Sequence, residues 1–509
     1  MIPHISRRKL VRMAGVAMGI GSLGRLFPFT PLTAAEAAVT PDLVQWRPEI
    51  LPLVQLIATT PREQCVAMLA AQLRKGVPFR ELMAATFLHA LQHDGHHTVY
   101  LVHAALELSR QLPPAERALP LFWAVDVVKE HIARFKETPV PPLAGPLPGN
   151  GGAEFDAAME AWDQERAERA VIALARSHGT GAALQRLCRY GARDWSFIGH
   201  VPIGISNAWR TLEVIGEQHA EPTLRYLVRE VHVRNANRTE GQSYGFNLEL
   251  VEQQFPKLPP DWPDTRADEK ATLELLAVIR SGDWKAASQW TARELSAGRV
   301  QAGTVWDAVH LAAGEFMIRF KLGNVRLGNR ALHSNTSGNA LHHLFKVCED
   351  ARTRFLITLQ AAAWAAAFTK NEADRGMLRE LTLTEMPVGD LPSASNETLE
   401  KIFALLPPRH AQQEVEDRSG QDQASRLALA LGQQPGLAEE FMTNARRLVL
   451  AKATINSHDV KFPIAIFENR SWVSPRWRPH LLAASVHFLH GTQMPDNEVT
   501  QRARDLVKA

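Results

Sequence analysis

Histidine is the residue type whose number and spacing in this chain most suggest chemistry. The chain has twenty histidines, and five of them fall within the fifteen residues from His89 to His103. Imidazole is a common neutral ligand of transition metals, and it titrates near pH 7. Histidines brought to one point could therefore bind a metal ion or transfer protons.

Histidines also precede apolar stretches at four separate places, and other polar residues follow each of them at similar spacing. On this pattern the predicted metal ligands are His96, His97, His103, His200, His333 and His458. A second set of polar side chains stands about ten residues further on. We expect these to be catalytic, as ligands or as partners of the ligands, and they are Glu107, His343 and Glu468.

The expected cofactor is a transition metal. Histidines with a carboxylate and open coordination positions are typical of non-haem iron enzymes that use O₂, whereas a closed set of four ligands suits zinc or copper. Iron is the first choice and copper or zinc the alternative. The opposing interpretation is structural, because an ancestral unit copied four times would also repeat histidines that only hydrogen-bond a preceding turn.

Other cofactor motifs are missing from the sequence after residue 37. That part has no H-E-x-x-H pair, no Walker A sequence, no G-x-S-x-G and no Rossmann fingerprint. Flavin or nicotinamide binding by those folds is therefore not expected.

The elements that would position these residues are helices. Apolar residues recur at spacings of three and four in the stretches 63–74, 160–176, 271–279 and 438–453, and alternation with a period of two is scarce. Asp94-Gly95 is expected to end one helix, so that His96 or His97 begins the next. The sequence predicts an all-α fold.

Three segments rich in Pro and Gly, at 138–152, 255–264 and 386–395, divide the chain into four pieces that resemble one another. We interpret the pieces as four divergent helical modules, formed by internal repeats and packed as a helical bundle or closed helical array. Their predicted bounds are 38–137, 153–254, 265–385 and 397–509.

Residues 1–37 are predicted to be a twin-arginine signal peptide. Arg7-Arg8-Lys9 is followed by a mildly apolar, Gly-rich stretch and then by Ala35-Glu36-Ala37, a small-x-small cleavage site. We therefore expect a twin-arginine translocase as a partner during export, and a periplasmic or extracellular location. Such export carries folded proteins, which allows a cofactor to be inserted before transport.

Charge and hydropathy limit the other partners. Five of the 57 basic and one of the 54 acidic side chains lie in the first 37 residues, so the remainder is close to neutral. This argues against nucleic acid as a partner. No uncharged apolar run of 18 residues follows the predicted signal, so no membrane span is expected. Three scattered cysteines indicate buried thiols with at most one disulfide.

The motifs HHTVYLVHAALEL, GHVPIGISNAW and HDVKFPIAIFE place a His at the start of an apolar helix and a polar residue about seven positions on. In spacing and residue type, over most of the chain after residue 37, this resembles the questin oxidase-like family. The resemblance implies an oxygenase without a recognisable flavin fold, with His96, His103, His200, His333 and His458 as site positions. This chain departs from the family in having Asn207 and Asn339 in the second and third modules where the first has His103. Family members act in intracellular polyketide pathways, to which an export signal is foreign, and this indicates a different substrate.

Three functions fit the sequence. The leading prediction is an exported, metal-dependent oxidoreductase of questin oxidase-like type, acting on a small organic molecule with O₂. The second is a periplasmic metal- or ligand-binding protein without catalysis. The third is a helical-repeat scaffold, which would need an exposed apolar groove for its partners.

Overall fold

The computed structural model describes residues 49–508, except for 94–95, 136–139, 141–142, 144, 194–197, 235–241, 322–324, 391–394 and 409–417. Within these ranges every regular element is an α-helix or a 3-10 turn, and an isolated bridge between Phe320 and Leu378 is the nearest feature to a strand. The predicted all-α class is confirmed. The predicted signal peptide lies outside the described residues.

The first eleven described α-helices are α3 (Leu51–Thr59), α4 (Cys65–Arg74), α5 (Phe79–Gln92), α6 (His96–Gln111), α7 (Leu119–Phe135), α8 (Gly151–Glu160), α9 (Gln164–His178), α10 (Thr180–Gly191), α11 (His200–Ile215), α12 (Ala220–Arg234) and α13 (Gln242–Gln254). The rest are α14 (Glu269–Arg280), α15 (Trp284–Ser296), α16 (Ala302–Arg319), α17 (Val325–Val347), α18 (Ala351–Ala373), α19 (Ser395–Ala404), α20 (Ser419–Gly432), α21 (Pro435–Lys452), α22 (His458–Trp472), α23 (Arg478–Ser485) and α24 (Glu498–Lys508).

Acidic N-caps explain where several helices begin. Asp268, Asp283 and Asp350 each accept a hydrogen bond from the backbone N–H three residues on, at 2.8–2.9 Å. Each bond satisfies an N–H that has no partner within the helix, and the carboxylate lies at the positive end of the helix dipole. The starts of α14, α15 and α18 are therefore set by local sequence.

The helical stretch predicted over 160–176 differs from the structure, which divides it into α8 and α9. Trp162 lies between the two helices with a φ of +57°, and the Asp163 side chain accepts from the Arg166 N–H to cap α9. A left-handed residue followed by an N-cap ends one helix and starts another, whatever the apolar spacing.

The helix that carries His333 begins earlier than the sequence pattern predicts. His96, His200 and His458 are the first residues of α6, α11 and α22, in agreement with the sequence pattern. α17 instead begins at Val325, so His333 lies more than two turns inside it. The His therefore reaches the centre from within a long helix in this module.

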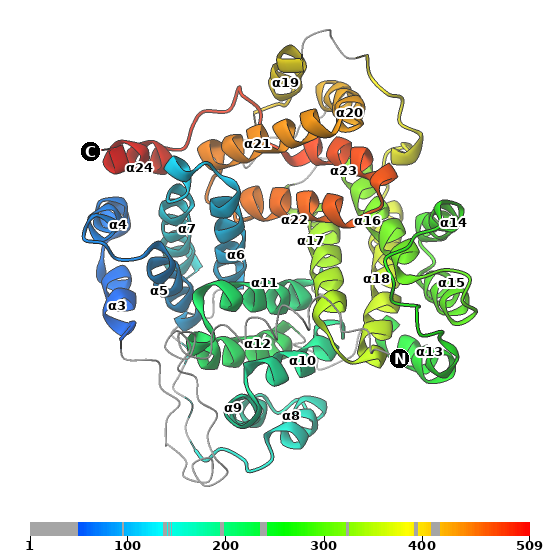
Figure 1. Cartoon of the computed structure of the whole chain (residues 1–509), viewed down its shortest axis with the longest axis horizontal. Helices are drawn as coiled ribbons and strands as arrows, with labels where there is room; N and C mark the ends of the chain where they lie inside the picture. The colour runs from blue at the N-terminus through cyan, green and yellow to red at the C-terminus, as the bar shows by residue number, and fades with distance from the viewer. Residues whose placement is uncertain are drawn as a thin grey trace, which may run out of the picture.

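Four helices make a closed ring at the centre of the molecule (Figure 1). α11 packs against α6 and α17, and α22 packs against the same two helices from the opposite side. The other helices surround this ring. The C-terminal helix α24 packs on α4 and α7, where Arg74 donates to the Leu506 carbonyl at 2.9 Å. The internal repeat of four modules itself stays a prediction.

The ring helices are buried over long stretches. Every residue of α11 from His200 to Leu212 is buried. Polar groups in such a helix lose their water and need partners inside the protein. No helix of the described residues combines the length and apolar character required to cross a bilayer.

Gly199 sets the approach of α11 to α17, and we predict that Gly199→Ala destabilises the fold by about 2–5 kcal/mol. Its φ is +78°, and an added Cβ would lie 2.3 Å from the Ser337 Cβ. The measurement is urea unfolding followed by circular dichroism. Gly181→Ala is the matched control, because Gly181 has no atom within 4 Å of an added Cβ. Equal stability of the two variants would contradict the prediction.

Candidate functional site

Four histidine rings meet at the centre of the helix ring. The ring centroids of His200 and His333 are 4.5 Å apart, and those of His333 and His458 are 4.9 Å apart. His97 closes the set, with its centroid 5.2 Å from both His200 and His458. One histidine comes from each of α6, α11, α17 and α22, in the same cyclic order as the helices. We call these four residues the imidazole cluster.

Three members of the imidazole cluster face one another through the same ring nitrogen. The Nε2 atoms of His200 and His333 are 3.0 Å apart, and those of His333 and His458 are 3.4 Å apart. All three side chains are buried. Facing Nε2 atoms at this separation either share a proton or direct lone pairs at a common ion.

Asn456 determines the tautomer of His458. The Asn456 Oδ1 accepts the His458 backbone N–H at 3.1 Å and lies 2.8 Å from the His458 Nδ1. Because this oxygen can only accept, Nδ1 of His458 carries a proton, and in its neutral form the ring presents the Nε2 lone pair to the imidazole cluster. Histidines that ligate metals are oriented by the same kind of outer hydrogen bond.

Lys461 lies beside the fourth member of the cluster. Its Nζ is 3.2 Å from the His97 Nδ1 and 5.3 Å from the centroid of the Tyr100 ring. The side chain is buried, and burial lowers the pKa of Lys461 to about 7. An amine that loses its proton near neutral pH can exchange protons with a neighbouring imidazole.

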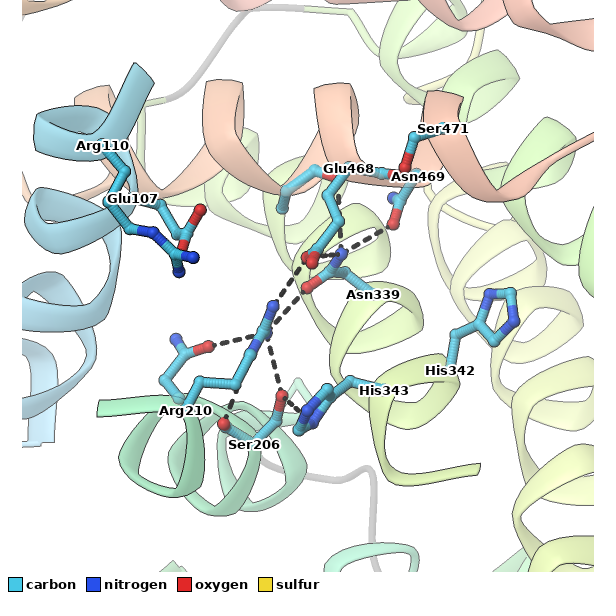
Figure 2. A network of polar contacts seen from close by, with 12 residues as sticks. Glu107, Arg110, Ser206, Arg210, Asn339, His342, His343, Glu468, Asn469 and Ser471 are labelled. Carbon is cyan, nitrogen blue, oxygen red and sulfur yellow. Dashed lines mark hydrogen bonds and ion pairs between the residues drawn. The ribbon is translucent and has the colours of Figure 1, made fainter. Parts of the chain in front are cut away.

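A second polar level is centred on Arg210, which is buried (Figure 2). Its guanidinium donates to the Glu468 carboxylate at 2.6 Å. It also donates to Asn339 Oδ1 and Asn207 Oδ1 at 3.1 Å, and to Ser206 Oγ at 2.9 Å. The Asn339 amide donates to the same carboxylate at 2.8 Å. Residues of α11, α17 and α22 are thus joined by one buried cation.

The three residues predicted to be catalytic lie on this second level and not with the imidazole cluster. Glu468 pairs with Arg210, and His343 Nδ1 lies 3.1 Å from Ser206 Oγ. Glu107 pairs with Arg110 of its own helix at 2.7 Å (Figure 2). Ten helical residues span about 15 Å along the axis, so the spacing that suggested a shared site separates these residues from the cluster.

A small cavity lies between the two levels. It has a volume of about 20 Å³, enough for a water-sized molecule. Lys461 lies on its wall as well as beside His97, so it connects the cavity to the imidazole cluster. The lining residues are His103, Ala104, Ile203, Asn207, Arg210, Thr336, Asn339, Lys461, Ile464, Ala465 and Glu468.

His103 faces this cavity, although it was predicted as a metal ligand. Burial lowers the pKa of His103 well below its usual value, so the ring is neutral and has one donor and one acceptor. Neither ring nitrogen has a hydrogen-bond partner within the described structure. Leaving both unsatisfied would cost about 1–3 kcal/mol for each group, so the cavity is suited to a small polar guest.

The remaining predicted ligands divide into two groups. His97, His200, His333 and His458 are brought together, whereas the side chain of His96 lies outside the described residues. In the part of the chain that the structure describes, no group of three or more His, Cys, Asp or Glu side chains is already arranged around a metal position.

Sequence reasoning missed Arg210, Lys461 and Asn456. A signal was available for the first two, because each is a single basic residue inside an otherwise apolar helical stretch of a histidine motif, ISNAWR and HDVKF. No pattern distinguished Asn456, whose role depends on the turn that precedes α22.

Comparison of the chain with protein-family models, with curated proteins and with solved structures gave no match. The resemblance to the questin oxidase-like family therefore stays a prediction made from residue types and spacing.

Lys461 should make the stability depend on pH. Its folded pKa of about 7 lies below the value of about 10.4 for an unfolded chain. Between these values the unfolded chain binds more protons, so the free energy of unfolding should rise with pH, by up to about 1.4 kcal/mol per unit from this group. Below pH 7 both states are protonated and the contribution is constant.

The measurement is urea unfolding of the wild type and of Lys461→Met at pH 7, 8, 9 and 10. We expect a shallower rise with pH for Lys461→Met. Lys270→Met is the control, because that side chain is 88% exposed, and it should run parallel to the wild type. Parallel curves for Lys461→Met and wild type would show that the amine is charged in the folded protein.

Proposed function

We propose that His200, His333 and His458 hold a redox-active transition metal, and that the protein is an oxidoreductase which uses O₂ on a small organic molecule. The observation that carries the proposal is the approach of three Nε2 atoms from three different helices, at 3.0 and 3.4 Å. The residue pattern that resembles the questin oxidase-like family supports the same class of reaction.

The separations between the nitrogen atoms fit a metal centre. Two imidazole nitrogens bound at about 2.0–2.1 Å, with bond angles from square to tetrahedral, lie about 2.9–3.4 Å apart. The two observed separations fall within this interval. The tautomer that Asn456 imposes on His458 directs its Nε2 toward His333, which would suit His458 to hold a metal.

The partners of the nearby carboxylates bear on which metal would be bound. Glu107 and Glu468 are engaged by arginines on the second level, so they do not supply the carboxylate typical of many non-haem iron sites. Iron therefore competes with copper, which also accepts sets of imidazole ligands. Either metal, when bound, would supply one-electron chemistry toward O₂.

The chain's own residues would position the small reactant and move protons. The cavity admits a molecule of the size of water, and the His103 ring offers it both a donor and an acceptor. Lys461 can pass a proton between His97 and the cavity, because it contacts both. The Glu468 side chain, on the cavity wall, is 30% exposed.

The export pattern in residues 1–37 supports a location outside the cytoplasm. A twin-arginine route would allow the metal to be inserted before the folded protein crosses the membrane. The substrate would then be an extracytoplasmic small molecule.

A second candidate, metal or ligand binding without catalysis, is favoured by the size of the cavity, which has no room for an organic substrate. A scaffold function would need an exposed apolar groove, and the exposed apolar side chains of the described residues do not indicate one. The large apolar side chains that are exposed in the described chain are scattered over separate segments, namely Leu51, Phe135, Val233, Leu381 and Val388.

Elemental analysis of the full chain tests the metal. We expect about one iron or copper per chain in the wild type, and loss of that metal in the double variant His200→Ala, His333→Ala with an unchanged helical signal. His178→Ala replaces an exposed histidine and should retain the metal.

O₂ uptake is measured with ascorbate as electron donor. We expect uptake by the wild type and by His178→Ala, and loss of uptake in the double variant. A metal-free wild type that remains metal-free after incubation with iron or copper would refute the metal centre, whereas metal without O₂ uptake would favour the second candidate.

Asn456→Ala tests whether the hydrogen bond between Asn456 and His458 serves metal binding or only the packing of the core. Loss of the outer hydrogen bond to His458 should weaken metal affinity by about 10–100-fold, measured by competition with a chromophoric chelator. Asn444→Ala is the control, because this partly buried asparagine donates to the Glu440 carbonyl of its own helix at 3.1 Å, away from the imidazole cluster. Unchanged affinity in Asn456→Ala would argue against His458 as a ligand.

A further inference from the structure

Two of the three cysteines meet at a helix contact away from the imidazole cluster. Cys188 lies within α10, and Cys348 directly follows the last residue of α17. Both are buried, and the two thiols lie close enough to influence each other's pKa. The function proposed above does not use either of them.

The surrounding backbone holds the two thiols together. Gln185 lies one helical turn before Cys188, on the same face of α10. Its amide nitrogen donates to the Val347 carbonyl at 2.9 Å, and its amide oxygen accepts the Glu349 N–H at 2.8 Å. The residues before and after Cys348 are therefore both tied to α10, which keeps Cys348 opposite Cys188.

We propose that Cys188 and Cys348 are a peroxide-oxidisable pair that closes to an intramolecular disulfide linking α10 to α17. The helix that would be tied down carries His333, Asn339 and His343, so the bond would restrain a helix that contributes to both polar levels.

The environment assigns different roles to the two sulfurs. Cys348 keeps 4% of its surface exposed whereas Cys188 keeps 0%, so peroxide reaches Cys348 first, and contact with Cys188 also lowers the pKa of Cys348. The thiolate is the nucleophile in thiol oxidation. Cys348 is therefore the attacking residue and Cys188 the resolving one.

The reaction balances with hydrogen peroxide as the oxidant. The Cys348 thiolate attacks one peroxide oxygen, the O–O bond breaks, and a sulfenic acid and hydroxide form. The Cys188 sulfur then attacks the Cys348 sulfur and displaces water. In total, two thiols and one peroxide yield one disulfide and two waters, and two electrons pass from sulfur to oxygen.

The experiment treats the purified full chain with one equivalent of hydrogen peroxide, then unfolds it in iodoacetamide and maps its peptides by mass spectrometry. We expect a cross-linked pair of peptides containing Cys188 and Cys348, with Cys65 alkylated. Cys65 is the internal control, since it is buried elsewhere and hydrogen-bonds to backbone carbonyls. Three alkylated cysteines, or a cross-link through Cys65, would overturn the proposal.

Single variants test the division of roles. In Cys188→Ser, Cys348 should be trapped as a sulfenic acid by dimedone, whereas in Cys348→Ser, Cys188 should remain a thiol. Cys65→Ser should still form the cross-link. The wild-type peptide map decides the existence of the pair even if a serine variant fails to fold. Equal dimedone labelling of the first two variants would overturn the assignment of the attacking residue.

Discussion

A buried imidazole must find its hydrogen-bond partners inside the protein, and the centre of this structure is organised around that constraint. His200, His333 and His458 lie where water is excluded, so their ring nitrogens face one another and nearby polar groups. This requires three helices to reach one point with their histidines in register. The close approach at Gly199 and the turn at Asn456 are local consequences.

The buried charge of Arg210 is neutralised on the second polar level, apart from the imidazole cluster. Arg210 is surrounded by one carboxylate and four neutral oxygens, which together accept most of its donors. Partial exposure of Glu468 reduces the desolvation of that pair. Lys461, by contrast, lies beside the His97 imidazole, and its burial lowers its pKa to about 7, so its proton is the more easily lost. The two cations thus have different uses: Arg210 binds helices together, whereas Lys461 is free to exchange its proton.

α17 connects these features. It contributes His333 to the imidazole cluster and Asn339 and His343 to the second level, and it ends beside the thiol pair. A shift of this one helix would disturb both polar levels together. α17 begins at Val325, so His333 does not open its helix, and the part of α17 from His333 to Val347 passes both levels and reaches α10.

The sequence by itself determined the helical class and many helix boundaries, because apolar spacing and N-caps act within one turn of the chain. It also singled out His96 or His97, His200, His333 and His458 as equivalent positions, since their recurrence before apolar stretches is visible without coordinates. Only the tertiary structure decided that these rings meet while Glu107, His343 and Glu468 do not join them. A pair of residues ten positions apart can recur in every repeat of a sequence, but on a helix the two residues lie about 15 Å apart along the axis. Arg210, Lys461 and Asn456 gained their roles in the same way, because burial and the partners supplied by other helices are properties of packing and not of local sequence.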